Sequence, residues 1–341
     1  MRRALALAAP HRTHPNPKVG AVLVDASGVV VGEGAHHGAG TPHAELLALT
    51  QAGEAARGST LYVTLEPCNH QGRTPPCVPS IVAAGVSTVV IGAIDPDPRV
   101  SGAGIAGLRQ SGVEVVTDVL SDESESLDRS YFHERRTGLP LVTLKLAMTL
   151  DGSVAASDAS SRWVTSEEAR ADSHLLRAEM DAIVVGAGTL RADDPLLTSR
   201  IEPAAAEQPV AVLVAGREPL PAVRRIWERS PLVIATEPID VPSGEVLIVE
   251  GEAGLPDPEA TARALARRGL YSVMLEGGPG LAGSWWRAGV VTRGVFYVAS
   301  RVGGGRGMSP LGGEFETMNR SRAVNIRDVR MVGPDIRIEF E

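Results

Sequence analysis

The chain has 341 residues, of which 43% are hydrophobic and 22% charged, so it is long enough to bury two cores and should form two domains. A net charge of -8 argues against nucleic acid as a partner, and 4% aromatic residues are too few for a base-stacking surface. No segment approaches the ~20 apolar residues of a membrane span. The short apolar run that ends at Pro10 predicts a first helix and not a signal peptide.

The first half alternates between strand and helix patterns. After the first helix, the predicted elements are strands at residues 19–24 and 29–34, a helix to about residue 56, a strand at 60–65, a helix at 77–84, a strand at 88–92, a helix at 104–111 and a strand at 113–117. A helix at 121–136 then meets Gly138 and Pro140, which stop helices, so a first domain of residues 1–138 is predicted. Short apolar runs flanked by helices indicate an α/β sheet covered on both faces.

The second half, residues 139–341, begins with an apolar run at 141–150. Residues 165–168, Thr-Ser-Glu-Glu, form a capping box for a helix to about residue 180. The remaining predictions are strands at 182–186, 210–214, 232–235 and 246–249, a helix at 258–268, a strand at 271–276, a helix at 281–288, and strands at 295–299, 324–332 and 336–340. Residues 201–208 and 216–223 are predicted loops. A second α/β domain follows from this order.

The two cysteines, Cys68 and Cys77, lie in the sequence LEPCNHQGRTPPC, downstream of His43 and Glu45. Two thiolates and an imidazole give Zn²⁺ three ligands and leave a fourth position open for water, as in catalytic zinc sites. Thr41 is predicted as the N-cap of the helix that carries His43, and a second helix should open at Cys77, so that both positive helix ends favour anions. Glu45 is not needed as a ligand and can carry protons.

The order His-x-Glu, Pro-Cys and Cys is typical of zinc-dependent deaminases. Those enzymes usually place two residues between the cysteines, whereas residues 69–76 intervene here. The longer loop contributes His70 and Arg73 as candidate substrate contacts. Two buried structural thiols are the alternative interpretation. Cysteines used as metal ligands are not available for disulfides, which predicts a reducing compartment and a cytoplasmic protein.

Several motifs resemble one family when they are taken in order. They are THPNP and VGAV in residues 13–22, HAE at 43–45, TLEPCNHQGRTPPC, and the later LKLAMTLDG, SRWVTS, RADDPLLT and LEGGPGLAG. Together they resemble the bifunctional deaminase/reductase family of riboflavin biosynthesis, over almost the whole chain. The resemblance implies an N-terminal cytidine-deaminase-like α/β/α sandwich with Zn²⁺ and a C-terminal dihydrofolate-reductase-like α/β domain with NADPH. It also implies deamination of a phosphorylated ribosylaminopyrimidine and reduction of its ribosyl group; we expect a homo-oligomer, a dimer or larger.

Asn16, His36, His70 and Arg73 are our candidates for holding the pyrimidine and its phosphate, and His70 and Arg73 are preferred because they lie in the cysteine loop. His36 beside His37 also fits an exposed turn. The resemblance implies further site residues in the second half. The family positions for NADPH fall on Ala147, Trp163, Thr189, Asp193, Gly278, Pro279, Gly280, Leu281, Ala282, Gly283 and Ser284. Those for the second substrate fall on Ser161, Arg177, Leu197, Arg200 and Glu276.

Two stretches match Gly-x-Gly-x-x-Gly, at residues 102–107 and 278–283. The first is predicted to be only a helix start. The second follows a strand and opens a helix, which suits a pyrophosphate. Both lack the acidic residue that a Rossmann domain places about twenty positions later. Gly216 and Arg217 are candidates for the adenosine 2′-phosphate, or they form an ordinary turn.

The polar candidates for hydride transfer are Lys145 and Asp193, which could orient the imine of the ring-opened sugar and supply a proton. Lys145 also fits a solvent-facing strand position. Arg177 and Arg200 could grip a phosphate or be solvated surface residues, and Trp163 could stack on a flat ring or belong to a core.

Two other functions fit parts of the sequence. One is a free-base or nucleoside deaminase whose second half no longer reduces a substrate, which an NADPH oxidation assay would reveal. The other is a zinc-stabilised binding module, which would need a fourth protein ligand, such as another histidine, to close the metal site.

Overall fold

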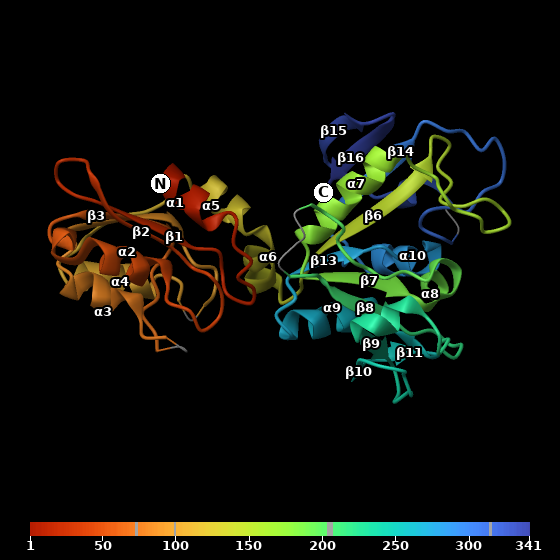
Figure 1. The fold of residues 1–341 in the computed structure, drawn as a ribbon, viewed down its shortest axis with the longest axis horizontal. Coiled ribbons are helices and arrows are strands. Elements are labelled where there is room, and N and C mark those ends of the chain that lie inside the picture. The colour runs from red at the N-terminus through yellow and green to blue at the C-terminus, as the bar shows by residue number, and fades with distance from the viewer. Residues whose placement is uncertain (72–73, 99, 203–206, 314–315) are drawn as a thin grey trace. The chain divides into compact units, whose positions relative to one another are not determined.

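The computed structural model describes residues 1–71, 74–98, 100–202, 207–313 and 316–341, which form two compact units, Met1–Gly138 and Leu139–Glu341 (Figure 1). Each unit has its own sheet and its own buried core. Within the described ranges, we find no helix with the length and apolar character that crossing a membrane requires.

The first unit is a three-layer α/β/α sandwich, as the resemblance implied. Its sheet has the order β2-β1-β3-β4-β5; β1 is antiparallel to both neighbours, and β3, β4 and β5 are parallel. The strands are β1 Gly20–Val24, β2 Val30–Ala35, β3 Thr60–Leu65, β4 Thr88–Ala93 and β5 Glu114–Val116. The helices are α1 Arg2–Ala8, α2 Ala44–Ala52 with the 3-10 turn η1 Gly53–Ala56, α3 Cys77–Ala83, α4 Ala103–Gln110, α5 Ser121–Leu127 and α6 Arg129–Thr137. Helices α2, α3 and α4 cover one face, and α1 and α5 cover the other.

The second unit is built on a nine-stranded sheet of order β10-β9-β8-β7-β13-β6-β14-β16-β15. Neighbouring strands are parallel from β10 to β14, and β16 and β15 add an antiparallel edge. The strands are β6 Leu141–Thr149, β7 Ala182–Gly186, β8 Val210–Val214, β9 Leu232–Ala235, β10 Glu245–Ile248, β13 Ser272–Leu275, β14 Arg293–Ala299, β15 Ile326–Val332 and β16 Asp335–Phe340. The remaining elements are α7 Glu167–Ala178, α8 Ala187–Asp193, η2 Arg225–Arg229, α9 Pro258–Arg267, α10 Pro279–Arg287, η3 Met318–Arg320 and a small hairpin of β11 Gly251–Glu252 and β12 Leu255–Pro256.

Successive side chains of the central strands pack into two cores, one on each face of the sheet. In β7, Val184 packs into the core under α9 and α10, whereas Ile183 packs into the core under α7 and α8. A strand buried on both faces must be apolar at successive positions, which explains the continuous apolar runs in the sequence. The predicted strands at 60–65, 182–186, 210–214 and 232–235 have the observed bounds.

Two local predictions are wrong, and one helix was missed. The helix predicted for residues 121–136 breaks into α5 and α6 at Asp128, whose carboxylate accepts hydrogen bonds from the backbone N–H groups of Tyr131 and Lys18 at 3.2 and 3.0 Å. Thr41 is not the N-cap of α2, because its hydroxyl donates to the Gly38 carbonyl and His43 occupies the cap position. Helix α8 was not predicted, since its seven residues are too few to show a periodicity.

Two glycines allow α2 to lie directly on β2. A Cβ at Gly34 would stand 2.3 Å from the carbonyl oxygen of Ala44 and 2.7 Å from the Cβ of Leu47, and a Cβ at Gly32 would stand 2.1 Å from the carbonyl oxygen of Ala48. These neighbours are backbone atoms or Cβ atoms, so they cannot rotate away. The position of the helix that follows His43 is therefore fixed by the absence of side chains on the strand beneath it.

We predict that Gly34→Ala destabilises the first unit by about 1–3 kcal/mol, the usual cost of overpacking, because the added methyl group must push α2 away from the sheet. Hydrogen exchange of the β1 and β3 amides should become faster. The matched control is Gly305→Ala, where a Cβ meets nothing within 4 Å and exchange in the first unit should not change. Equal exchange rates in both variants would contradict this account of the contact.

Candidate active sites

Three side chains of the first unit converge where two helices begin. Their ligand atoms, a ring nitrogen of His43 and the Sγ atoms of Cys68 and Cys77, all lie within 4.8 Å of one another. Cys68 follows β3, Cys77 is the first residue of α3, and His43 directly precedes α2. The N–H groups of Cys77 and Val78 donate to the Cys68 carbonyl at 3.0 and 3.2 Å, which brings the backbones of the two cysteines together. The predicted metal ligands thus come together.

The orientation of the His43 ring suits a metal ligand. Its Nδ1 lies 3.2 Å from the Cys77 sulfur and 3.6 Å from the Cys68 sulfur, and its Nε2 lies 2.8 Å from the hydroxyl oxygen of Thr74. When Nε2–H donates to Thr74, the lone pair is on Nδ1, facing the sulfurs. One nitrogen and two sulfurs are a donor set that Zn²⁺ prefers, so these residues fit the metal. Thr74 was not predicted from the sequence, although its place beside Pro75 in the cysteine loop was a signal.

The two sulfurs share a proton unequally. The hydrogen bond with Cys77, together with the contact with His43, outweighs burial and lowers the pKa of Cys68 to about 4. The same bond raises the pKa of Cys77, and burial adds to this rise. A thiolate is therefore already favoured at Cys68, and a divalent cation would favour it at both sulfurs.

Glu45 lies next to the cysteine cluster without belonging to it. It is the second residue of α2, is only 4% exposed and contacts Cys77. Burial raises the pKa of its carboxyl group. A carboxyl group with a raised pKa holds a proton more readily than an ordinary carboxylate, which is the property expected of a residue that accepts and returns a proton in catalysis.

His36 is not in an exposed turn, because it is only 3% exposed. Its Nδ1 lies 3.1 Å from the Pro42 carbonyl oxygen and its Nε2 lies 2.9 Å from Nδ2 of Asn16. When Nδ1–H donates to Pro42, Nε2 accepts from the Asn16 amide and so fixes which end of that amide is the oxygen. His70 is exposed, and Arg73 lies outside the described residues.

The first Gly-x-Gly-x-x-Gly stretch serves the fold, as predicted. The N–H groups of Gly102 and Gly104 donate to the buried carboxylate of Glu66 at 3.0 and 2.9 Å. A Cβ at Gly104 would stand 2.0 Å from the Pro67 carbonyl oxygen. This helix start is therefore occupied by a side chain of the chain itself.

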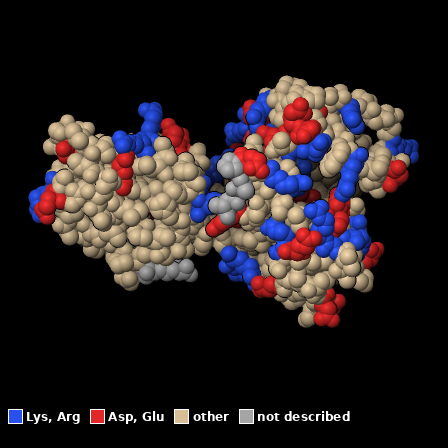
Figure 2. All heavy atoms as spheres, viewed as in Figure 1, with Lys and Arg blue, Asp and Glu red and all other residues tan. Residues whose placement is uncertain are grey.

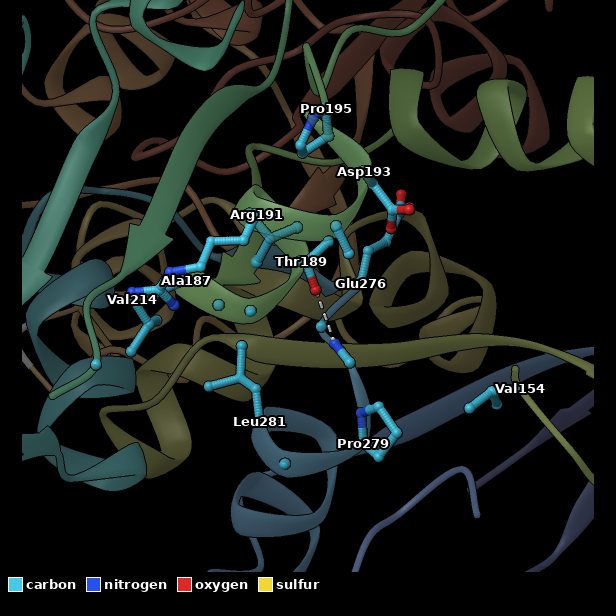
Figure 3. Close-up of a pocket in the computed structure, with 18 of the residues that line it drawn as sticks. Val154, Ala187, Thr189, Arg191, Asp193, Pro195, Val214, Glu276, Pro279 and Leu281 are labelled. Carbon is cyan, nitrogen blue, oxygen red and sulfur yellow. Dashed lines mark hydrogen bonds between the residues drawn. The ribbon is translucent and has the colours of Figure 1, made fainter. Parts of the chain in front are cut away.

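A cavity of about 1760 Å³ lies in the second unit (Figure 3). Most residues that the sequence analysis assigned to this half line it. They are Lys145, Ala147, Ser161, Trp163, Arg177, Thr189, Asp193, Leu197, Arg200, Gly216, Glu276, Gly278, Pro279, Gly280, Leu281 and Ser284. Ala282 and Gly283 are not among the lining residues: Ala282 is fully buried in the core, and a Cβ at Gly283 would stand 1.6 Å from the Leu311 carbonyl oxygen.

The start of α10 offers an open cradle to a ligand. Gly278 is the N-cap of this helix, and its N–H donates to the hydroxyl group of Thr189 at 3.0 Å (Figure 3). A Cβ at Gly280 or at Gly188 would meet nothing within 4 Å, so a ligand can approach the backbone there. The combination of a helix N-terminus, open glycines and a large cavity fits the pyrophosphate of a dinucleotide such as NADPH.

A buried ionic cluster lies at the wall of the cavity. The Arg177 guanidinium donates two hydrogen bonds to the Glu276 carboxylate, at 2.6 and 2.8 Å, and Nζ of Lys145 lies 3.9 Å from the same carboxylate. Burial raises the pKa of Glu276, but the charges of Arg177 and Lys145 outweigh burial and lower that pKa to about 2. Burial also lowers the pKa of Lys145. Lys145 and Arg177 are therefore cavity residues and not solvated surface cations.

Three further predicted residues that line the cavity are Asp193, Trp163 and Arg217. The Asp193 side chain is 40% exposed, with Nε of Arg162 3.9 Å from its carboxylate. Trp163 is 60% exposed and carries the Arg170 guanidinium 4.5 Å from its ring centroid, so it is not a core residue. Arg217, which follows Gly216, donates from Nε to the Ala253 carbonyl at 3.0 Å. Figure 2 shows basic side chains over the middle of this unit, interleaved with acidic ones.

Comparison with known proteins identifies both halves. Residues 1–93 match the cytidine and deoxycytidylate deaminase zinc-binding region, and residues 140–337 match the RibD C-terminal domain. The riboflavin biosynthesis protein RibD of Aquifex aeolicus is 38% identical over 100% of this chain and 97% of its own length. RibD of Acinetobacter baumannii has a solved structure with a TM-score of 0.90 and 34% identity, covering 99% of this chain and 96% of its own.

A solved structure from Thermotoga maritima, described as a diaminohydroxyphosphoribosylaminopyrimidine deaminase/5-amino-6-(5-phosphoribosylamino)uracil reductase, has a TM-score of 0.88 and 32% identity, covering 100% of this chain and 97% of its own. The likeness thus extends through both units. The chain belongs to the RibD family and is a bifunctional enzyme of riboflavin biosynthesis, a zinc-dependent deaminase and an NADPH-dependent reductase.

Proposed function

We propose that residues 1–138 deaminate 2,5-diamino-6-ribosylamino-pyrimidinone 5′-phosphate and that residues 139–341 then reduce the ribosyl group to ribityl, giving 5-amino-6-ribitylamino-uracil 5′-phosphate. The observation that carries the first step is the convergence of His43, Cys68 and Cys77 beside the buried Glu45. The cavity that joins the α10 cradle to the Lys145 and Glu276 cluster supports the second step.

In the deamination, His43, Cys68 and Cys77 would hold Zn²⁺, which acidifies water and so supplies the nucleophile for the amine-bearing ring carbon. Glu45 takes a proton from the attacking water and delivers a proton to the amine nitrogen, which leaves as ammonia. Thr74 keeps the His43 ring in the tautomer that presents Nδ1 to the metal.

Substrate binding in the first unit involves the loops that flank the metal ligands. Asn16 presents its amide oxygen to the pyrimidine, because His36 engages its amide nitrogen. His70 and Arg73 belong to the cysteine loop and bind the ring and the phosphate. In this assignment His36 acts on the substrate mainly through Asn16, since both of its nitrogens have protein partners.

In the reduction, the residues at the start of α10 that line the cavity hold the pyrophosphate of NADPH; they are Gly278, Pro279, Gly280, Leu281 and Ser284. Trp163 and Thr189 border the same cofactor. Lys145 orients the imine of the ring-opened sugar, because its ammonium group lies inside the cavity wall beside Glu276. Asp193 is the more exposed of the two polar candidates and supplies the proton that accompanies hydride. Arg177 and Glu276 hold each other, and Arg200 binds the substrate phosphate.

The assembly and location of the enzyme are part of the proposal. A homo-oligomer is supported by the outer strand β15, which exposes Ile326, Val329 and Met331 by 63, 56 and 63% at the edge of the sheet. A cytoplasmic location is supported by the need of two cysteine ligands for a reducing compartment.

Glu45→Gln should lower the rate of deamination by about 10²–10⁴-fold, the usual contribution of a positioned acid–base residue, because an amide cannot shuttle the proton. Ammonia release is the readout, and zinc content and NADPH oxidation with deaminated substrate should remain unchanged. Glu54→Gln, on the exposed 3-10 turn after α2, is the matched control. Wild-type ammonia release in Glu45→Gln would rule out the assigned role.

Removing zinc with a chelator should abolish ammonia release and leave the reduction of deaminated substrate unchanged, because the metal ligands and the cavity belong to separate units. Re-addition of Zn²⁺ should restore ammonia release. Reduction of deaminated substrate would also exclude the alternative function, a deaminase with an inactive second half. If the chelated protein still released ammonia, the proposed metal chemistry would be wrong.

Arg217→Ala should raise KM for NADPH by about tenfold and leave KM for NADH unchanged, because a guanidinium group at the 2′-phosphate matters only to the phosphorylated cofactor. Initial rates with each cofactor provide the measurement. Arg263→Ala, on the exposed face of α9 where Arg263 pairs with Glu259, is the control. An equal change for both cofactors would assign Arg217 to the turn and not to the cofactor.

A further inference from the structure

The segment of residues 196–200 borders the cavity and is held residue by residue. Arg229 donates to the Leu196 and Leu197 carbonyls at 3.3 and 3.0 Å, Arg177 donates to the Thr198 carbonyl at 3.0 Å, and the Gln208 amide both accepts from the Ser199 N–H at 2.8 Å and donates to the Ser199 carbonyl at 3.2 Å. At the last position, His174 contacts both the side chain and the backbone nitrogen of Arg200.

His174 lies on α7, three residues before Arg177, so the two side chains share one face of the helix. Nε of Arg200 lies 3.2 Å from Nε2 of His174, and the backbone nitrogen of Arg200 lies 3.3 Å from Nδ1. A neutral imidazole has one acceptor nitrogen, so these two contacts are alternatives. The charged guanidinium is the stronger donor, which places the acceptor at Nε2 and the proton on Nδ1.

His174 remains a neutral acceptor at physiological pH. Burial lowers the pKa of His174 to about 4, and the charges of Arg177 and Arg200 lower it in the same direction. The two arginines therefore differ in their partners. The charge of Arg177 is opposed by the Glu276 carboxylate, whereas Arg200 is oriented by an uncharged ring. Among the residues that the structure describes, no carboxylate forms an ion pair with Arg200.

We propose that His174 is a positioning residue, which holds the Arg200 guanidinium at the cavity so that it can bind the phosphate of the reductase substrate. The inference rests on the proposed function of the second unit and on the role of Arg200 in it. His174 accepts from Nε and does not use Nη1 and Nη2, the pair of nitrogens that forms a fork for phosphate. A guanidinium that is already oriented loses less side-chain entropy when the anion binds.

The test is steady-state reduction by the full-length, zinc-loaded enzyme, with deaminated substrate and with the same compound lacking its phosphate. His174→Ala should raise KM for the phosphorylated substrate by about tenfold, the effect of one charge-assisted hydrogen bond, with kcat and KM for NADPH unchanged. KM for the compound without phosphate should not change. Arg200→Ala should reproduce this pattern with an equal or larger rise.

Two amide variants distinguish positioning from packing. His174→Gln places an amide near the position of Nε2 and should restore KM to within about twofold of the wild type, whereas His174→Asn reaches only the position of Nδ1 and should behave like His174→Ala. In the double variant, His174→Ala should add nothing to Arg200→Ala, because the histidine acts through the arginine. Additive effects of the two substitutions would overturn the proposal.

The failure of this inference is distinguishable from a failure of the proposed function. If Arg200→Ala raises KM for the phosphorylated substrate and His174→Ala does not, His174 has no positioning role and the phosphate site stands. If neither substitution changes that KM, the assignment of Arg200 is wrong as well. A rise of KM for NADPH together with a fall of kcat in His174→Ala would indicate a disturbed fold. If His174→Asn then restored both values, His174 would be a packing residue, and the proposal would be wrong.

Discussion

The first active site depends on the two hydrogen bonds by which the Cys68 carbonyl accepts from the N–H groups of Cys77 and Val78. These bonds bring a residue at the end of β3 next to the first turn of α3, although a ten-residue segment from 68 to 77 connects them. A longer separation of the cysteines than is usual in nucleobase deaminases therefore does not separate the sulfurs. The additional residues lengthen the connection in the sequence without moving the metal ligands apart.

The second active site depends in a similar way on the Glu276 carboxylate. This carboxylate lies just after β13 and carries a full negative charge inside the cavity wall, because Arg177 binds it through two hydrogen bonds and Lys145 lies nearby. A buried charge is tolerable only when it is paired in this way. The pairing orients Lys145 as well as Arg177, and Arg177 in turn reaches the Thr198 carbonyl. Glu276 thus connects Lys145 of β6, Arg177 of α7 and, through Arg177, the loop that contains Thr198.

The sequence was most informative where a pattern has a local physical cause. Buried central strands such as β7 and β8 had to be apolar throughout, and the cysteines with His43 and Glu45 could be placed from their proline and helix signals. Other features depend on contacts between distant segments and had no local signal. The break between α5 and α6 at Asp128 depends on a contact with Lys18, and the burial of His36 depends on Asn16. The proposed role of His174 depends on Arg200. The predicted roles of individual residues in catalysis and binding remain predictions.

The close contact between β2 and α2 has a consequence for how the first active site could change during evolution. With Gly32 and Gly34 beneath it, the helix that carries Glu45 lies in direct contact with β2 and cannot move closer to the sheet. A change of preferred pyrimidine cannot easily come from moving this helix. Diversification would instead be confined to the segments around Asn16 and His70, which lie outside the helices and strands and can accept new side chains without disturbing the sheet.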